Sequence, residues 1–435
     1  MTAQGNSDEN SKETVSNPSA HFIPVVKADL IAALAEQGVQ RDQLADFHTL
    51  CTFLGSYFHH DFYDELTELK DIYAWFSPNG PKPMRRQTMT ADAAFARLTA
   101  IFESVMARAN FVEMPKSEVF ALGGEHPLLD VKTRTPMERY EGIRIFYRGT
   151  HTEEFDKPTA FGLAKEHIEL EALDDVVVFV RFALEETQKR KRKLELPGGA
   201  KPGSVMIKSF RNITRAELPM LLPDVKVVMS RKDALLLGGP ALLGGVPLAL
   251  NILPALSVVL VVIGAYLGFS GQVSQDKLMK AVGALSVLIG AGAFMWRQYS
   301  NYSFRKLKYQ KRLADNVYFK NVNNDVGVFE SLISAAEEQE TKEVILAYHA
   351  LLTGGPVAHS IELDRRIEQS LRDTFAANVD FEVSDALKKL ETLGFLKEKD
   401  GKMAVVNMAE ALARLDTLWD RLYDFSKDQR AGAAA

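Results

Sequence analysis

The chain has 435 residues and a net charge of −5, from 52 basic and 57 acidic side chains. Hydrophobic residues make up 46% and charged residues 25%, values typical of globular proteins and unlike those of a wholly disordered or fibrous chain. The acidic balance argues against nucleic acid as a partner, because nucleic-acid-binding proteins usually carry a basic excess. The only cysteine, Cys51, excludes an internal disulfide and a cysteine-rich zinc site.

The N-terminal part predicts an α+β domain over residues 22–233, after a polar, disordered tail of residues 1–21. Apolar side chains recur at spacings of three and four residues, which is typical of amphipathic helices. The expected helices are 29–36, 42–75 and 91–109. Apolar and alternating runs then predict short strands of a small antiparallel sheet. The expected strands are 143–147, 176–182, 204–210 and 225–229.

An uncharged stretch from Ala234 to Gln275 and a further apolar run from Ala281 to Trp296 predict insertion into a membrane. A bilayer core of about 30 Å needs roughly 20 apolar residues in a helix. We expect two spans, at about 248–269 and 278–296, that form an antiparallel transmembrane hairpin within residues 234–297. The alternative is a pair of buried core helices in a soluble protein, but such helices normally carry a polar stripe.

The residues around and within the spans indicate how the hairpin is oriented and packed. Basic residues flank the two spans at Arg231, Lys232, Arg297, Arg305, Lys306, Lys308, Lys311 and Arg312. The positive-inside rule then places both flanking domains in the cytoplasm. Small residues let membrane helices approach closely, so we expect packing contacts, within the hairpin or between copies, at two pairs spaced four apart. These pairs are Gly264 with Gly268 and Ser286 with Gly290.

Glycine and proline interrupt the apolar residues before the first span, as at Gly238, Gly239, Pro240 and Pro247. Each proline removes a backbone donor, and an unmet hydrogen-bond partner is costly in lipid. This lead-in is therefore either a kinked interfacial approach or a re-entrant segment that lines a pore. In the second span, residues 281–296 include no ionisable side chain, which weighs against an ion path there.

Two groups of side chains have the residue types of a metal or cation site. His60 and Asp64 are spaced four apart, as two metal ligands on one helix face would be, or they belong to an ordinary helix surface. Four carboxylates either bind a cation or pair with the basic helix that precedes them. These carboxylates are Glu337, Glu338, Glu340 and Glu343.

Five consecutive bases follow the second expected strand. They are Lys189, Arg190, Lys191, Arg192 and Lys193. Such a run is either a solvated turn or a contact with an anionic leaflet, where each base adds about 1 kcal/mol of attraction.

The C-terminal region, residues 298–430, is predicted to be helical and to end in a winged-helix-like module. Helices are expected at 328–352, 381–393 and 408–425, and Asp400-Gly401 predicts a β-hairpin between the last two. A DNA-reading helix would need a basic surface. In the expected helix 381–393, the acids Glu382, Asp385 and Glu391 outnumber the bases Lys388 and Lys389. We therefore expect this module to contact protein and not nucleic acid.

Three blocks of sequence resemble one known family. They are Phe58-His59-x-x-Phe62-x-x-x-Leu66-x-x-Leu69-Lys70-Asp71-x-Tyr73-Ala74, Tyr140-Glu141-Gly142-Ile143-Arg144-Ile145-Phe146-Tyr147-Arg148-Gly149 and Glu217-Leu218-Pro219-Met220-Leu221-Leu222-Pro223. With the apolar segment, they are similar to the transmembrane protein 143 family, whose shared domain has no assigned function. The resemblance covers roughly residues 22–406. It implies a two-span membrane protein with large soluble flanks, and it supplies no catalytic residues.

The resemblance and the N-terminus together bear on localisation. Eukaryotic members of the family are associated with mitochondria. Residues 1–21 are acidic and contain no arginine, unlike a mitochondrial transit peptide, and no signal-peptide pattern is present. We therefore favour a bacterial inner membrane with both termini in the cytoplasm, or a mitochondrial membrane if the protein is eukaryotic.

The sequence contains no phosphate-binding loop, dinucleotide fingerprint, nucleophile elbow or zinc-protease motif, so we name no catalytic residue and no cofactor. We expect an α+β integral membrane protein that acts as a membrane-anchored cytoplasmic scaffold or regulatory protein. Its partners would be the lipid bilayer and a protein, or a second copy of the chain. The alternatives are a subunit of an oligomeric channel or transporter, with 238–254 along the path, and an unrecognised membrane-tethered enzyme.

Overall fold

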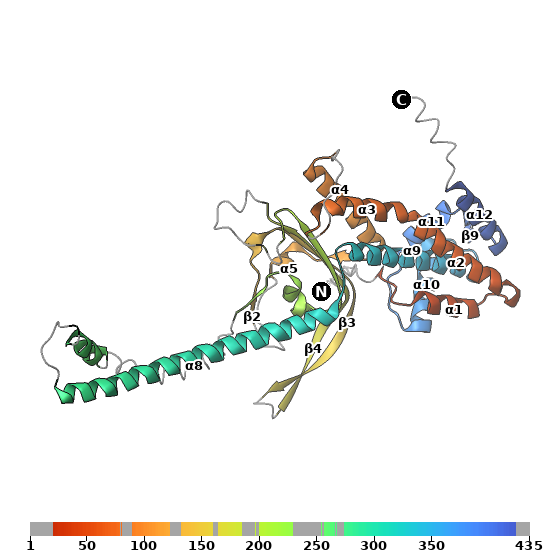
Figure 1. Cartoon of the computed structure of the whole chain (residues 1–435). Coiled ribbons are helices and arrows are strands. Elements are labelled where there is room, and N and C mark those ends of the chain that lie inside the picture. The colour runs from red at the N-terminus through yellow and green to blue at the C-terminus, as the bar shows by residue number, and fades with distance from the viewer. Residues whose placement is uncertain are drawn as a thin grey trace, which may run out of the picture.

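The computed structural model shows a body of helices and strands from which one long helix, α8, projects (Figure 1). The structure describes residues 21–78, 80, 89–121, 132–159, 164–184, 196, 200–228, 254, 256–265, 267 and 274–422. The five bases Lys189 to Lys193 therefore lie outside the described residues, as does the lead-in 234–247.

Helices precede and follow the apolar segment. Before it lie α1 (Lys27–Glu36), α2 (Leu44–Asp61), α3 (Tyr63–Phe76), α4 (Ala91–Arg108) and α5 (Lys116–Ala121). After it lie α8 (Gln275–Lys320), α9 (Val326–Gly354), α10 (Ser360–Phe375), α11 (Val383–Thr392) and α12 (Met408–Arg421). Short 3₁₀ helices are η2 (Arg41–Gln43), η3 (Met137–Arg139) and η6 (Arg215–Leu221).

The strands form one five-stranded antiparallel sheet and two small ladders. They are β1 (Val112–Glu113), β2 (Lys132–Arg134), β3 (Tyr140–Thr159), β4 (Ala164–Phe182), β5 (Val205–Thr214), β6 (Lys226–Val228), β7 (Asn321–Asn324), β8 (Leu396–Lys399) and β9 (Lys402–Val405). The main sheet has the order β1-β3-β4-β5-β7, while β2 pairs with β6 and β8 with β9. The predicted hairpin at Asp400-Gly401 is thus present, and the bridge between Val357 and Met403 adds a third chain segment to it.

β4 is the central strand, and alternate side chains enter opposite cores. Val177 and Phe179 pack on one face of the sheet, and Val176 and Val178 pack on the other. This alternation follows from the two-residue period of a strand. The small antiparallel sheet is therefore present, but it differs from the prediction at two places. The expected strand 225–229 forms β6, outside the main sheet, and Asn321–Asn324, for which no strand was predicted, forms the edge strand β7.

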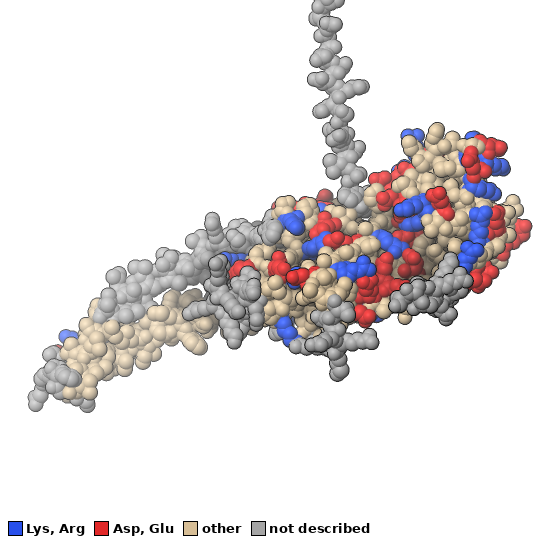
Figure 2. All heavy atoms as spheres, turned by 90° about the horizontal axis from the view of Figure 1, so that it is seen from above, with Lys and Arg blue, Asp and Glu red and all other residues tan. Residues whose placement is uncertain are grey.

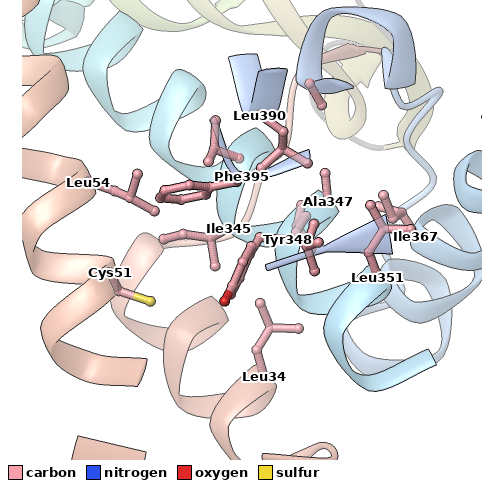
Figure 3. Close-up of a cluster of buried hydrophobic side chains, with 14 of the residues drawn as sticks. Leu34, Cys51, Leu54, Ile345, Ala347, Tyr348, Leu351, Ile367, Leu390 and Phe395 are labelled. Carbon is pink, nitrogen blue, oxygen red and sulfur yellow. The ribbon is translucent and has the colours of Figure 1, made fainter. Parts of the chain in front are cut away.

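Three hydrophobic cores build the body, and α9 passes through two of them. The first half of α9 packs with α3, α4 and one face of the sheet; we call this the sheet–helix core. The second half packs with α1, α2, α10, α11 and α12; we call this the helical core. Figure 3 shows part of the helical core, where Tyr348 of α9 packs against Phe395 at a ring distance of 5.5 Å. Both cores combine elements from before and after the apolar segment.

The expected single helix 42–75 is two helices, α2 and α3, separated at Phe62. The reason is a change of core. Phe58, at the end of α2, belongs to the helical core, whereas the fully buried Phe62 belongs to the sheet–helix core. Arg108 stacks on the Phe62 ring at 3.7 Å and fixes the break from the other side. One straight helix would not point its apolar face into both cores.

The predicted two-helix transmembrane hairpin is wrong for the described residues. Only one helix there is long and apolar enough to cross a membrane, over Leu278–Asn301 within α8. The described part of the expected first span is the helix Leu256–Ala265, about 15 Å long, half of what a bilayer core requires. The second expected span, 278–296, corresponds to Leu278–Asn301, and the helix continues beyond it to Lys320 without a glycine or proline. The sequence therefore located one apolar helix, but the described residues do not contain the second crossing that it predicted.

A buried histidine should make the helical core sensitive to acid. Burial lowers the pKa of His349, which lies between Phe47 and the carbonyl of Gln37. The unfolded chain, with an ordinary histidine pKa of 6.5, then binds a proton first as the pH falls. We expect the free energy of unfolding to fall below pH 6.5, by at most about 1.4 kcal/mol per pH unit from this group.

The variant His349→Gln should lose this part of the pH dependence, and His48→Gln, at an exposed position of α2, should retain it. Chemical unfolding of the detergent-solubilised protein between pH 7.5 and pH 5 measures both. Parallel curves for the wild type and His349→Gln would show that His349 does not contribute.

Candidate functional site

The apolar half of α8, Leu278–Asn301, is exposed to an unusual degree. Only 11% of the residues in the most apolar stretch of this half are buried. Met279 is 78% exposed, Ile289 65% and Trp296 71%. Figure 2 shows this arm almost without charged side chains, whereas charged residues cover the body. A continuous apolar surface of this kind marks a contact with lipid or protein, because soluble monomers rarely expose one.

The two ends of this apolar half differ chemically. Trp296 and Tyr299 lie at the end nearer the body, with ring centroids 6.4 Å apart. The following turns of the helix carry basic residues, at Arg297, Arg305, Lys306, Lys308, Lys311 and Arg312. Aromatic side chains followed by bases are typical of the membrane–water interface.

α8 is attached to the body at its C-terminal end. Lys320 Nζ lies 2.7 Å from Glu217 Oε2. Glu217 is buried and also accepts the backbone N–H of Thr214, closing the capping box of η6. The strand that directly follows α8, β7, pairs with β5 of the main sheet. The helix is therefore joined to the sheet without a separate linker.

The small-residue pairs predicted for close helix packing are only partly described. Ser286 and Gly290 are exposed on α8, and a Cβ atom added at Gly290 would meet nothing within 4 Å. Gly264 is half-buried in the helix Leu256–Ala265, and Gly268 lies outside the described residues. Packing at these positions stays a prediction.

A cluster of charged side chains, with the buried Glu340 and Glu343 at its centre, lies where the two cores meet, in the middle of α9; we call it the ionic junction. Its members are Asp61, Glu65, Arg108, Glu340, Glu343, Asp385 and Lys389. Arg108, at the end of α4, lies 2.9 Å from Glu340 and 2.7 Å from Asp61. Lys389 of α11 lies 2.7 Å from Glu340 and also pairs with Glu343. The junction therefore fastens α2, α4 and α11 to α9.

The junction holds more acids than bases, and its pKa values reflect this. Burial raises the pKa of Glu343, although Lys389 and Asn110 oppose the rise. Burial alone would lower the pKa of Lys389, but Glu343 and Glu340 raise it above its ordinary value. Lys389 thus stays charged, and Glu343 takes up a proton early as the pH falls. The adjoining pocket, of about 440 Å³, is lined by the same side chains.

The same polar stretch of α9 holds the N-terminal segment. Gln339 accepts the backbone N–H of Ile23 at 3.2 Å and donates to its carbonyl at 3.4 Å. Lys342 donates to the same carbonyl at 3.2 Å. The role of these residues was not predicted from the sequence. The pattern that could have indicated it is the run of polar residues inside a long apolar helix.

Among the described side chains, the four carboxylates of the predicted cluster pair with residues outside the basic part of α8. Glu337 contacts His59 of α2, and Glu338 contacts Lys342 of α9. Glu340 and Glu343 contact bases from α4 and α11 in the junction. Helix α9 turns these side chains to different sides, so that they meet elements distant in the sequence.

His60 and Asp64, for which the sequence left open a metal site or an ordinary helix surface, are divided by the helix break at Phe62. His60 lies at the end of α2 near Trp419, with rings 6.2 Å apart, and Asp64 lies in α3. Within the part of the chain that the structure describes, no three His, Cys, Asp or Glu side chains form a group able to hold a metal ion.

One family matches part of the chain. Residues 173–327 match the family described as "Protein of unknown function (DUF3754)". The match runs from β4 through β5, η6, β6 and α8 to β7, so the chain contains this domain of unknown function. It does not confirm the transmembrane protein 143 family that the motifs resemble. No solved structure matches the chain.

The ionic junction gives a direct stability test. Lys389→Met leaves Glu340 and Glu343 buried with too few partners, and breaking a buried ion pair by removing one member typically costs about 3–5 kcal/mol. We expect a loss of that size in the free energy of unfolding, measured by chemical denaturation. Lys388→Met changes the adjacent, exposed residue of the same helix and should stay within about 0.5 kcal/mol of the wild type. Equal losses for the two variants would contradict the junction's role.

Proposed function

We propose that this protein is a membrane-anchored scaffold or regulatory protein, held by α8, with its body at the cytoplasmic face of a bacterial inner membrane. The observation that carries the anchor is the apolar half of α8, which has the length of a membrane span and is almost wholly exposed. In a membrane, lipid instead of water would surround this apolar surface.

The side of the membrane follows from two observations. The helical and sheet–helix cores combine residues from before and after the apolar segment, so both flanks belong on one side, and the apolar segment as a whole would enter the bilayer from that side and return to it. The bases that follow Tyr299 lie next to the body and favour the cytoplasmic side. Together these support a cytoplasmic body with both termini on that side.

The scaffold part of the proposal rests on a groove between α11 and the β8–β9 hairpin. The groove has a volume of about 730 Å³. Its lining combines Leu387, Leu396 and Met403 with the charged residues Lys388, Glu391, Lys397, Glu398 and Lys402. Apolar side chains within a ring of both charge signs suit a protein segment better than nucleic acid, which requires a basic surface.

The ionic junction strengthens the case against nucleic acid. Lys389 was counted from the sequence as a surface base of α11, but it is directed into the junction and neutralised there. The outer surface of α11 therefore keeps Glu382 and Glu391 against Lys388. An acidic helix is repelled by a phosphate backbone.

Charged substitutions in α8 test the anchor. Leu285→Lys with Ile289→Lys places two ammonium groups near the centre of the apolar half, each costing about 2.5–3.5 kcal/mol in a bilayer. We expect the wild type to stay in the carbonate-washed membrane pellet and this double variant to be largely lost from it. The matched control is Leu307→Lys with Phe319→Lys, at exposed apolar positions of the same helix beyond Asn301. A wild-type protein in the soluble fraction without detergent would refute the anchor.

Charge reversal in the groove tests the scaffold. Lys397→Glu with Lys402→Glu alters two exposed side chains of the hairpin and leaves the helical core intact. We expect protein partners that co-purify stoichiometrically from gently solubilised membranes to be reduced at least about tenfold, by quantitative mass spectrometry. Lys116→Glu, exposed on α5, is the control and should leave them unchanged. The same partners at the same amounts in the groove variant would rule out this surface.

A further inference from the structure

Another pocket lies within the helical part of the body. It is separate from α8 and from the groove between α11 and the β8–β9 hairpin. It has a volume of about 710 Å³, within the range of small-molecule sites. Its lining comes from α1, α2, α3, α9 and α12: Lys27, Ile31, Cys51, Thr52, Gly55, Ser56, His59, His60, Tyr63, Glu337 and Trp419. The proposed membrane anchoring uses none of these residues.

α2 opens the pocket by presenting small side chains to it. Thr52, Gly55 and Ser56 lie on one face of this helix, next to the buried Cys51. Glycine in a helix interior is less favourable than alanine. A Cβ atom at Gly55 would meet only Lys27 Nζ, at 3.6 Å, so packing alone does not demand glycine there. The glycine keeps free space in front of the ammonium group of Lys27.

The polar groups of the pocket are unequally paired. Glu337 is held by His59, with Oε1 to Nδ1 at 3.0 Å. The hydroxyls of Thr52 and Ser56 donate to carbonyls one turn back in α2. Lys27, by contrast, forms no ion pair within 4.0 Å in the described part of the chain, although the more distant carboxylates of Glu337 and Glu338 interact with it electrostatically. Its ammonium group is therefore the charge that an incoming group could pair with.

Aromatic rings also line the pocket. Trp419 of α12 is fixed edge-to-face by Phe53 at 5.7 Å and lies 6.2 Å from the His60 ring. Trp419 is still 36% exposed and Tyr63 60%. Exposed rings held at a pocket wall favour contact with another flat ring. The Cys51 thiol adds no charge, because burial raises its pKa to about 12.

We propose that this pocket binds a small planar organic anion of the aromatic carboxylate class, with its ring against Trp419 and its carboxylate at Lys27. An anion is favoured over a cation because Glu337, the carboxylate that lines the pocket, is already paired with His59 at 3.0 Å, whereas Lys27 has no ion pair within 4.0 Å among the described residues. Ring and charge are needed together, since neither the aromatic wall nor a single ammonium group selects a ligand alone.

The test uses equilibrium dialysis of the full-length protein in detergent, with detergent alone as the blank. The probes are 2-naphthoate and its neutral analogue 2-naphthamide. We expect saturable 1:1 binding of 2-naphthoate to the wild type. Lys27→Met should weaken it at least about tenfold, the value of one charge-assisted contact, and leave 2-naphthamide unchanged. Gly55→Leu should fill the pocket and weaken both probes.

The control Lys70→Met removes a surface lysine that pairs with Glu330 outside the pocket, and it should bind like the wild type. Unfolding midpoints of all variants establish that they are folded. The proposal is overturned if 2-naphthoate shows no saturable binding beyond the detergent blank, or if Lys27→Met binds it as tightly as the wild type does. Either result leaves the membrane anchor unaffected, because the pocket and α8 share no residue.

Discussion

Two carboxylates in the middle of α9, Glu340 and Glu343, are buried together, and the arrangement of the body depends on how they are compensated. Buried charges without partners cost several kcal/mol each, more than a domain can spare from its net stability. Arg108 from α4 and Lys389 from α11 must therefore reach the same point of α9. Apolar contacts on either side tolerate small shifts, but paired charges do not. The junction thus fixes the sheet–helix core against the helical core.

The same rigidity extends along α8. Lys320 is held by Glu217, and the helix continues without a break for about 69 Å from its first residue to its last. From Asn301 to Lys320 it covers about 28 Å, so a bilayer around the apolar half would keep the body at a defined distance. The bases of this stretch would lie near anionic headgroups, where each adds about 1 kcal/mol of attraction. A rigid helix of this kind suits a protein that presents a binding surface at a fixed distance from the membrane.

Local patterns predicted much of the fold, and contacts between distant segments explain the errors. Periodicity located α4, α9 and α12, the valine run gave the central strand, and Asp400-Gly401 gave the hairpin. The break at Phe62 was not predictable, because it depends on which core each aromatic side chain enters. The partners of Glu340 are 232 residues away at Arg108 and 49 away at Lys389, and spacing along one helix does not reveal them. The pocket at Trp419 likewise brings together helices from both ends of the chain.

The family match includes some of these features and leaves out others. Residues 173–327 contain most of the central strands, the apolar segment and α8, so the helix proposed as the membrane anchor and the sheet in which it ends belong to one matched unit. The Lys27–Trp419 pocket and the α11 groove lie wholly outside it, in α1, α2, α3, α9 and the elements after α9. Function resides in such sites more than in the fold that carries them. The matched unit therefore contains the proposed anchor, and the helical core, joined to it through α9, contains the pocket and the groove for which we propose ligand and partner binding.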